Sequence, residues 1–436
     1  MKTKPSNKKI NLISLGCSKN LVDSEVLMGQ LNSNNIKVTF EKEGADADVV
    51  VINTCGFIHD AKQESIDTIL SYVDAKNSGL IEKVYVMGCL SERYKKDLEA
   101  EIEDVDSYFG VNDINKIVAE LGGQYKKELV GERVLTTPSH FAYLKIAEGC
   151  DRRCSFCAIP FIRGKHVSRP VDEIVDEAKR LINKGVKEII LISQDLSYYG
   201  LDLYKKNMLP GLVDRLSALE GMEWLRLHYL YPFSFPVEVL DLMKERENIC
   251  NYVDMPVQHI SDKILKSMRR GHGKSGTYKL LEKVKSIIPD AALRTTLITG
   301  YPGETEKDFQ QLLDFIAEIK FDRLGVFAYS PEEGTAAFKL KDDIPDRIKQ
   351  ERVDAIMDLQ QNISLKLNKE KVGKTFKTLI DRKEGEYFIG RTEYDSPEID
   401  NEVLVTANSA KIVVGNFINV KVSEAEYFDL FGTFSR

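Results

Sequence analysis

The chain has 436 residues, of which 43% are hydrophobic and 30% are charged, and its formal net charge is −7. This composition is typical of a soluble protein with about two to four domains and a sizeable core. The negative charge argues against a protein that mainly coats nucleic acid, and no run approaches the roughly 18 uncharged apolar residues of a membrane helix. The N-terminus lacks a signal-peptide core and cleavage site, so we expect a cytoplasmic protein without a disulfide framework.

Residues 1–136 alternate apolar strand patterns with helical patterns and form the first expected domain. Strands are expected within residues 8–18, 47–55 and 82–89. Continuous β-branched apolar runs are typical of parallel strands that are covered on both faces. Strands that alternate with helices predict a doubly wound α/β sheet.

Each of these three strands ends at a cysteine with a glycine beside it. The carboxyl ends of the strands line the ligand crevice in open α/β sheets, and glycine lets the backbone approach closely. A single cysteine there is often only a small buried hydrophobe, but three at equivalent positions favour a shared iron–sulfur cluster with one open iron. The cysteines are Cys17, Cys55 and Cys89, and the glycines are Gly16, Gly56 and Gly88.

A second cysteine group, with CxxxCxxC spacing, opens the second expected domain, residues 137–345. It consists of Cys150, Cys154 and Cys157. A four-iron cluster normally takes four thiolates, so three leave one iron open, as a catalytic metal requires. The alternatives are a zinc knuckle or a redox pair, but zinc needs a fourth nearby ligand, and His166 lies beyond Pro160. We therefore expect an iron–sulfur cluster here.

Six apolar strands alternate with helical patterns through the rest of this domain. They predict a partial (β/α) barrel, whose chemistry is built at the C-terminal face. His228 and His259 near the strand ends are interpreted as structural, and Cys250 as a core thiol. The run 160–165 carries two cations that either offset cluster or substrate charge or belong to a solvated loop.

The tail consists of a connector helix, residues 346–373, and a small antiparallel β-barrel, residues 374–436. In that last segment five Lys and three Arg stand against seven Glu and four Asp. An acidic barrel is a poor binder of RNA phosphates and a plausible docking surface for a basic protein. A mildly acidic solvated surface without function is the alternative.

The chain resembles the radical S-adenosylmethionine (SAM) methylthiotransferase family over essentially its whole length. The CxxxCxxC loop, with Phe156 before its last cysteine, resembles the cluster loop of radical SAM enzymes. The runs LGCSKNLVDSE, INTCGFIHDAKQESID and MGCLSERY resemble the N-terminal domain of methylthiotransferases, and the ending EYFDLFG resembles their TRAM domain. The resemblance implies two 4Fe-4S clusters. The cluster on the CxxxCxxC loop cleaves SAM to a radical, and the N-terminal cluster offers its open iron to a sulfur species.

The resemblance also implies a set of residues that contact SAM. Gln194 and Asp195 correspond to the position that holds the amino group and ribose of SAM. Arg294 is the candidate for its carboxylate, which a guanidinium can clamp with two hydrogen bonds. Phe156 is expected to support the adenine, and the turn 299–305 is expected beside the adenosyl group.

Asn20, residues 23–25 and the run 391–400 resemble the members that modify an aspartate of ribosomal protein S-twelve. Such members attach a methylthio group to the β-carbon, an unactivated position that requires radical chemistry. The implied partners are that protein or the small ribosomal subunit and an electron donor such as flavodoxin or ferredoxin, with no membrane and with tRNA disfavoured. The alternatives are a tRNA methylthiotransferase that acts on a modified adenosine, a zinc-containing nucleic-acid-binding module and a structural interaction protein.

Overall fold

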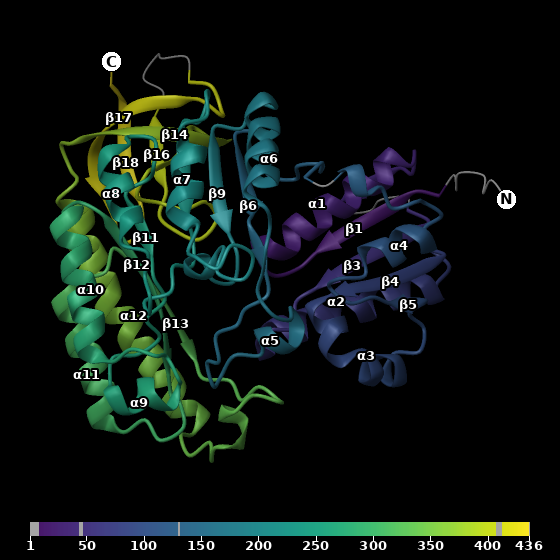
Figure 1. The fold of residues 1–436 in the computed structure, drawn as a ribbon, viewed down its shortest axis with the longest axis horizontal. Coiled ribbons are helices and arrows are strands. Elements are labelled where there is room, and N and C mark those ends of the chain that lie inside the picture. The colour runs from purple at the N-terminus through teal and green to yellow at the C-terminus, as the bar shows by residue number, and fades with distance from the viewer. Residues whose placement is uncertain (1–7, 43–46, 130, 407–411, 436) are drawn as a thin grey trace. The chain divides into compact units, whose positions relative to one another are not determined.

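The computed structural model describes residues 8–42, 47–129, 131–406 and 412–435 (Figure 1). By its internal contacts the chain divides into two compact units, each described here by itself. The first comprises residues 1–137, 143–152 and 158–177, and the second comprises residues 138–142, 153–157 and 178–436. Two short segments that follow the first predicted domain in the sequence therefore fold with that domain.

The first unit is built on a five-stranded sheet with the order β2-β1-β3-β4-β5, in which every neighbouring pair is parallel. This confirms the predicted doubly wound α/β fold, and two further strands flank the three that were expected. The strands are β1 Ile10–Ser14, β2 Val38–Phe40, β3 Val49–Thr54, β4 Lys83–Gly88 and β5 Ser107–Tyr108.

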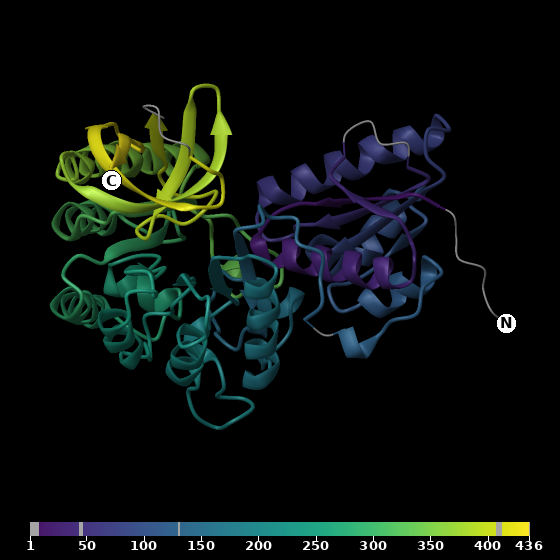
Figure 2. The same cartoon turned by 90° about the horizontal axis from the view of Figure 1, so that it is seen from above.

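Helices cover both faces of this sheet (Figure 2). Successive residues of β3 point to opposite faces: Val49 and Val51 pack in the core under α1 and α4, whereas Val50 and Ile52 pack in the core under α2 and α3. The helices are α1 Ser18–Ser33, α2 His59–Asn77, α3 Cys89–Glu101 and α4 Ile114–Glu120. The same unit contains η1 Lys127–Leu129, the antiparallel pair β7 Ala147–Glu148 and β8 Val167–Ser168, and the short helix α5 Ile159–Ile162.

The central part of the chain forms a partial barrel of six strands, as predicted. They lie in two three-stranded sheets, β10-β9-β6 and β11-β12-β13, and the Cys250 N–H donates to the Leu225 carbonyl at 3.0 Å where the two sheets meet. The strands are β6 Phe141–Lys145, β9 Glu188–Ile192, β10 Trp224–Leu227, β11 Tyr252–Asp254, β12 Ala292–Thr299 and β13 Arg323–Ala328. The helices and turns between and after them are α6 Val171–Asn183, η2 Leu196–Tyr198, α7 Leu209–Ser217, α8 Glu238–Glu245, α9 Asp262–Ser267, α10 Lys274–Ile287, α11 Glu306–Ile319 and η3 Ala337–Lys339. These strands and helices belong to the second unit, except that β6 and α6 are each divided between the two units.

The connector helix α12, Asp346–Lys369, is packed into the second unit. Gln360 donates to the Phe321 carbonyl at 2.8 Å, and Asn368 donates to the Glu426 carbonyl at 3.1 Å. The closed barrel that follows has the order β14-β15-β16-β18-β17, and its β16–β18 pair is parallel where an all-antiparallel barrel was predicted. Its strands are β14 Thr375–Glu384, β15 Tyr387–Thr392, β16 Val403–Thr406, β17 Phe417–Ala425 and β18 Leu430–Ser435. No helix in the described part of the chain is long and apolar enough to cross a membrane.

The excess of acid in the C-terminal barrel is directed inward. Asp395 pairs with Arg323, and Asp400 lies 3.5 Å from Arg294, so barrel carboxylates neutralise arginines of the central domain. Among the described residues 374–406 and 412–435, five exposed basic side chains balance five exposed acidic ones. The expected acidic outer face is therefore not supported, because the sequence count included carboxylates that are buried as ion pairs.

Candidate metal centre

The three N-terminal cysteines follow three strands that are neighbours in the sheet. Cys17 precedes α1 and follows β1, Cys55 comes directly after β3, and Cys89 follows β4 as the first residue of α3. Since β1, β3 and β4 are adjacent and parallel, their carboxyl ends meet at one edge of the sheet. The structure thus brings these three predicted ligands to one place, and all three are free thiols.

Glycines allow the backbone to close around these thiols. A Cβ on Gly16 would lie 2.7 Å from Cys55 Cβ and 2.9 Å from its sulfur. Gly88 has φ +101°, and a Cβ there would lie 2.3 Å from Asn53 Oδ1. All three distances are shorter than side-chain carbons tolerate, so any larger residue would move the strand ends that carry the cysteines.

Burial keeps the thiols of Cys55 and Cys89 protonated in the absence of a cation. Desolvation raises the pKa of Cys89 to about 12, and charge on Cys17 or Cys55 would raise it further, while Arg163 opposes the shift. Desolvation likewise raises the pKa of Cys55. Metal binding to such thiols releases their protons. The positive charge of bound iron would stabilise the thiolates, which burial otherwise disfavours.

The donor set, three thiols, suits an iron–sulfur cluster. Within the ranges that the structure describes, no three Cys, His, Asp or Glu side chains converge on one metal ion. In a four-iron cluster each cysteine binds a separate iron, so its thiolates stand farther apart than the ligands of a zinc ion. Three soft sulfur donors at the edge of a sheet therefore match the predicted iron–sulfur site.

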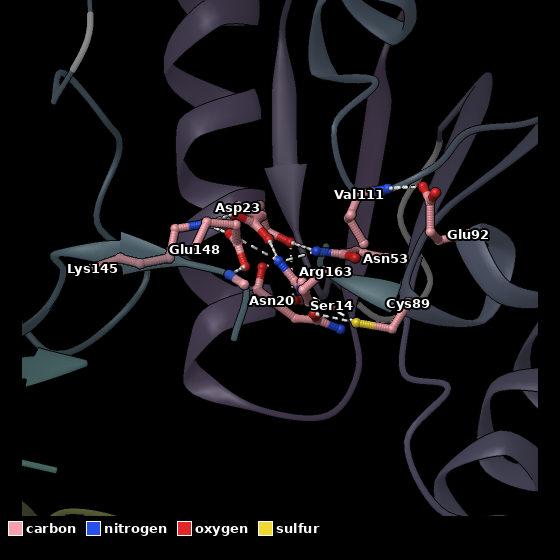
Figure 3. Close-up of polar contacts among 12 residues, drawn as sticks. Ser14, Asn20, Asp23, Asn53, Cys89, Glu92, Val111, Lys145, Glu148 and Arg163 are labelled. Atoms are coloured by element: carbon pink, nitrogen blue, oxygen red, sulfur yellow. Dashed lines mark hydrogen bonds and ion pairs between the residues drawn. The ribbon is translucent and has the colours of Figure 1, made fainter. Parts of the chain in front are cut away.

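A buried polar network adjoins these thiols (Figure 3). Arg163, which follows α5, donates from Nη2 to Cys89 Sγ at 3.3 Å and also to Asn20 Oδ1. Its Nη1 donates to Asp23 Oδ2 at 2.6 Å and to Glu148 Oε2 at 3.2 Å. From the sequence, this cation was expected either to offset cluster or substrate charge or to belong to a solvated loop after the CxxxCxxC group. The structure places its guanidinium against Cys89 of the N-terminal group.

Asn20 joins the loops that carry the cysteines. Its side-chain amide donates to the Leu15 carbonyl at 2.9 Å and to the Thr54 carbonyl at 3.0 Å, so it ties the end of β1 to the end of β3. Its own backbone carbonyl accepts from Asn53 at 2.8 Å. In the sequence, Asn20 was noted only as part of a family resemblance. Its role in joining the two strand ends depends on contacts with Leu15 and Thr54 that no local sequence pattern reveals.

The CxxxCxxC group has different surroundings. The Cys150 N–H donates to the Gly164 carbonyl at 3.1 Å in the first unit. In the second unit Arg270 Nη1 donates to Cys154 Sγ at 3.3 Å, and the Cys157 N–H donates to the Cys154 carbonyl at 3.2 Å. Arg270 is buried and its guanidinium stacks over the ring of Tyr231, yet the sequence did not single it out.

The predicted SAM contacts divide into two sets. Phe156 packs against a buried cluster that includes Tyr301, a residue of the turn that was expected near the adenosyl group. Gln194 follows the C-terminal end of β9, and buried Asp195 accepts from the Ser197 N–H at 2.8 Å. Arg294, by contrast, is near the N-terminal end of β12 and pairs with Asp254 at 2.9 Å and with Asp400. The structure does not bring Arg294 to the strand ends where Gln194 lies, and two carboxylates of the chain already occupy its guanidinium.

Three family models match successive parts of the chain. They are described as "Radical SAM superfamily" for residues 144–316, "Uncharacterized protein family UPF0004" for residues 9–110, and "TRAM domain" for residues 372–434. The class defined by this fold and these sites is a radical SAM protein with a TRAM domain.

Relatives extend this similarity over nearly the whole chain. A protein of Flavobacterium johnsoniae is 58% identical and one of Cytophaga hutchinsonii is 57% identical, each over 99% of both chains. A protein of Bacteroides thetaiotaomicron is 52% identical over 97% of this chain and 98% of its own. All three are named ribosomal protein uS12 methylthiotransferase RimO. The chain belongs to this family of radical SAM methylthiotransferases.

Solved structures share the fold at low sequence identity. The radical SAM methyltransferase TsrM of Kitasatospora setae has a TM-score of 0.52 and 14% identity, covering 75% of this chain and 74% of its own. The cobalamin-dependent radical SAM enzyme OxsB has a TM-score of 0.51 and 14% identity, covering 82% of this chain and 56% of its own. At this identity the likeness concerns the fold alone.

Proposed function

We propose that this protein attaches a methylthio group to the β-carbon of an aspartate in ribosomal protein uS12. The observation that carries the proposal is identity of 52% to 58% to proteins named for this activity, over almost the full length of the chain. The β-carbon of an aspartate has no acidic proton and no leaving group for general acid–base catalysis to use. A radical that removes a hydrogen atom is the chemical solution, and a cofactor must supply it.

In this proposal Cys150, Cys154 and Cys157 hold one 4Fe-4S cluster. That cluster supplies, when bound, an electron and an open iron position at which SAM is cleaved reductively. Arg270 donates a hydrogen bond to the sulfur of Cys154 and so supports one ligand. Phe156, packed against the buried cluster that contains Tyr301, offers an aromatic surface for the adenine. Gln194 and Asp195 follow the C-terminal end of β9 and are the candidates for the amino group and ribose of SAM.

Cys17, Cys55 and Cys89 hold the second 4Fe-4S cluster. When bound, it offers one iron position for the sulfur that is to be transferred. Two molecules of SAM would be consumed. One takes up one electron and leaves as methionine and 5′-deoxyadenosine, which carries away the substrate hydrogen. The other gives its methyl group to sulfide and leaves as S-adenosylhomocysteine, and joining the methylthiolate to the substrate radical gives back one electron. The convergence of the three thiols at the edge of one sheet supports this assignment.

The substrate is the free ribosomal protein or the small subunit, and a flavodoxin or ferredoxin supplies the electrons. A tRNA substrate is the other candidate, because the related tRNA-modifying enzymes share the chemistry. The balanced outer charge of the C-terminal barrel favours neither, so the assignment depends on the names of the relatives.

The experiment supplies both substrates to the same enzyme. The protein with both clusters is incubated anaerobically with SAM, reductant and sulfide, in one arm with uS12 and small subunits and in the other with unmodified tRNA. Mass spectrometry is expected to find one added methylthio group on an aspartate of uS12 and none on tRNA, and the C154A variant is the inactive control. Modification of tRNA alone would overturn the proposal.

A further inference from the structure

Arg163 follows the CxxxCxxC group in the sequence, but its side chain contacts the N-terminal cysteines. We infer that Arg163 is a positioning residue for the N-terminal cluster, and that its hydrogen bond to Cys89 sets the reduction potential of that cluster. The inference deepens the proposed function and rests on its assignment of a cluster to Cys17, Cys55 and Cys89.

The contact is direct and buried. Nη2 of Arg163 lies 3.3 Å from Cys89 Sγ, and the arginine side chain is 2% exposed. The same nitrogen donates to Asn20 Oδ1. The Asn20 side chain is held in place by the hydrogen bonds that its amide donates to the Leu15 and Thr54 carbonyls. Figure 3 shows the guanidinium with Cys89 on one side and with Asp23 and Glu148 on the other.

Two carboxylates fix the orientation of the guanidinium. Nη1 donates to Asp23 at 2.6 Å and to Glu148 at 3.2 Å, and Lys145 donates to both of these carboxylates. Two acids and two cations therefore balance each other in this network. Because a guanidinium is planar and rigid, binding Nη1 on one edge directs Nη2 toward Cys89.

This arrangement favours the reduced form of a cluster on Cys89. Reduction adds one negative charge, and a nearby cation that donates to a ligand sulfur stabilises that charge. Hydrogen bonds to the sulfurs are among the factors that set the potentials of iron–sulfur clusters, and a buried, weakly screened site strengthens them.

A purely structural role makes a different prediction. Cys89, Val111, Ala158 and Ile162 form a small apolar cluster that holds α5 against the start of α3 without Arg163. If Arg163 only helped to hold this segment, its replacement would change stability or iron content but leave the potential unchanged. The reduction potential therefore separates the two roles.

The test uses the full-length chain with the C150A, C154A and C157A substitutions, so that the N-terminal site is the only expected cluster site. R163Q and R163K are compared with this parent by an EPR-monitored redox titration. R163Q is expected to lower the equilibrium constant for one-electron reduction about tenfold, which corresponds to about 59 mV. R163K keeps the charge but not the planar fork, so a smaller decrease is expected.

R270Q in the same parent is the matched control, because Arg270 donates to Cys154 and to none of the N-terminal cysteines. It is expected to leave the potential unchanged. An R163Q protein with full iron and the parent potential would overturn the inference, and so would an equal shift in R270Q. If R163Q loses its iron, R163K decides: a lowered potential supports the inference and the parent potential refutes it. A parent that binds no four-iron cluster would instead refute the proposed function of the N-terminal cysteines.

Discussion

Arg391 in β15 of the C-terminal barrel forms an ion pair with Glu188 at the start of β9, with 2.7 Å between the charged atoms. Neither side chain is more than 2% exposed. Glu188 also accepts from Arg226 at 2.7 Å, and Arg391 also pairs with Asp381 at 2.7 Å. Buried charges thus join the C-terminal barrel to the central domain, and Arg391 and Glu188 depend on their partners because they have almost no access to water.

Removal of one member of this set should loosen the C-terminal barrel. R391M leaves Glu188 and Asp381 buried with fewer partners, and the expected loss in the free energy of unfolding is about 3–5 kcal/mol. Urea unfolding and limited proteolysis of residues 374–436 provide the measurement. The control is R382M, because Arg382 forms its pairs with Glu384 and Glu402 at the surface, where such pairs contribute about 1 kcal/mol or less. Equal losses in the two variants would contradict the assignment.

Gly88 offers a direct test of the N-terminal site. G88A places a methyl group against Asn53 and Thr54 at a residue with φ +101°, so the strand end before Cys89 must move. Anaerobically reconstituted protein should fall from about eight to about four iron atoms per chain. G79A is the control, since Gly79 also has positive φ but a Cβ there would meet nothing within 4 Å. Full iron in G88A, or equal losses in both variants, would refute this account of the glycine.

The carboxylate of Asp308, in the first turn of α11, is expected to stabilise the folded protein to a degree that depends on pH. Desolvation acts to raise its pKa, but hydrogen bonds from Ser261 and Thr305 outweigh it and hold the pKa below the usual value. A carboxylate with a lowered pKa in the folded state stabilises the protein above the unfolded pKa, and this stabilisation is lost as the pH falls through the folded pKa.

D308N should therefore destabilise the protein most at pH 7. The difference from wild type is expected to shrink once the pH falls below about 4, where the carboxyl of the unfolded chain is protonated. Thermal unfolding of the cluster-free protein from pH 7 down to about pH 2 measures this difference, because the stabilisation is lost only below the unfolded pKa. D314N, on the exposed face of the same helix, controls for the loss of one charge. A difference for D308N that does not change with pH would contradict the role assigned to the carboxylate.

The parts of the fold that depend on local pattern could be predicted from the sequence. The β-branched runs before Cys17, Cys55 and Cys89 predicted parallel strands, and the structure places those strands side by side. Once the strands are parallel neighbours, the cysteines that end them must share an edge. The six strands of the central domain and the closed C-terminal barrel followed from the same reasoning.

Contacts between residues distant in the sequence could not be predicted in this way. Arg163 follows the CxxxCxxC group closely, and the sequence left it either as an offset for cluster or substrate charge or as part of a solvated loop, whereas its guanidinium contacts Cys89. Arg270 reaches Cys154 from the segment after α9, and no periodic pattern marks that contact. Asp395 and Asp400 added to an acidic count, although they neutralise arginines of the central domain. Charge counts cannot reveal which carboxylates are buried as pairs.

The most direct test of the account is whether SAM cleavage and sulfur transfer depend on separate groups of cysteines. The C17A/C55A/C89A variant is incubated anaerobically with SAM, reductant, sulfide and uS12, beside wild type and C150A/C154A/C157A. Mass spectrometry follows both 5′-deoxyadenosine and the mass of uS12. We expect that C17A/C55A/C89A still forms 5′-deoxyadenosine but adds no methylthio group, whereas C150A/C154A/C157A does neither. A methylthio group on uS12 from the C17A/C55A/C89A variant would contradict the account.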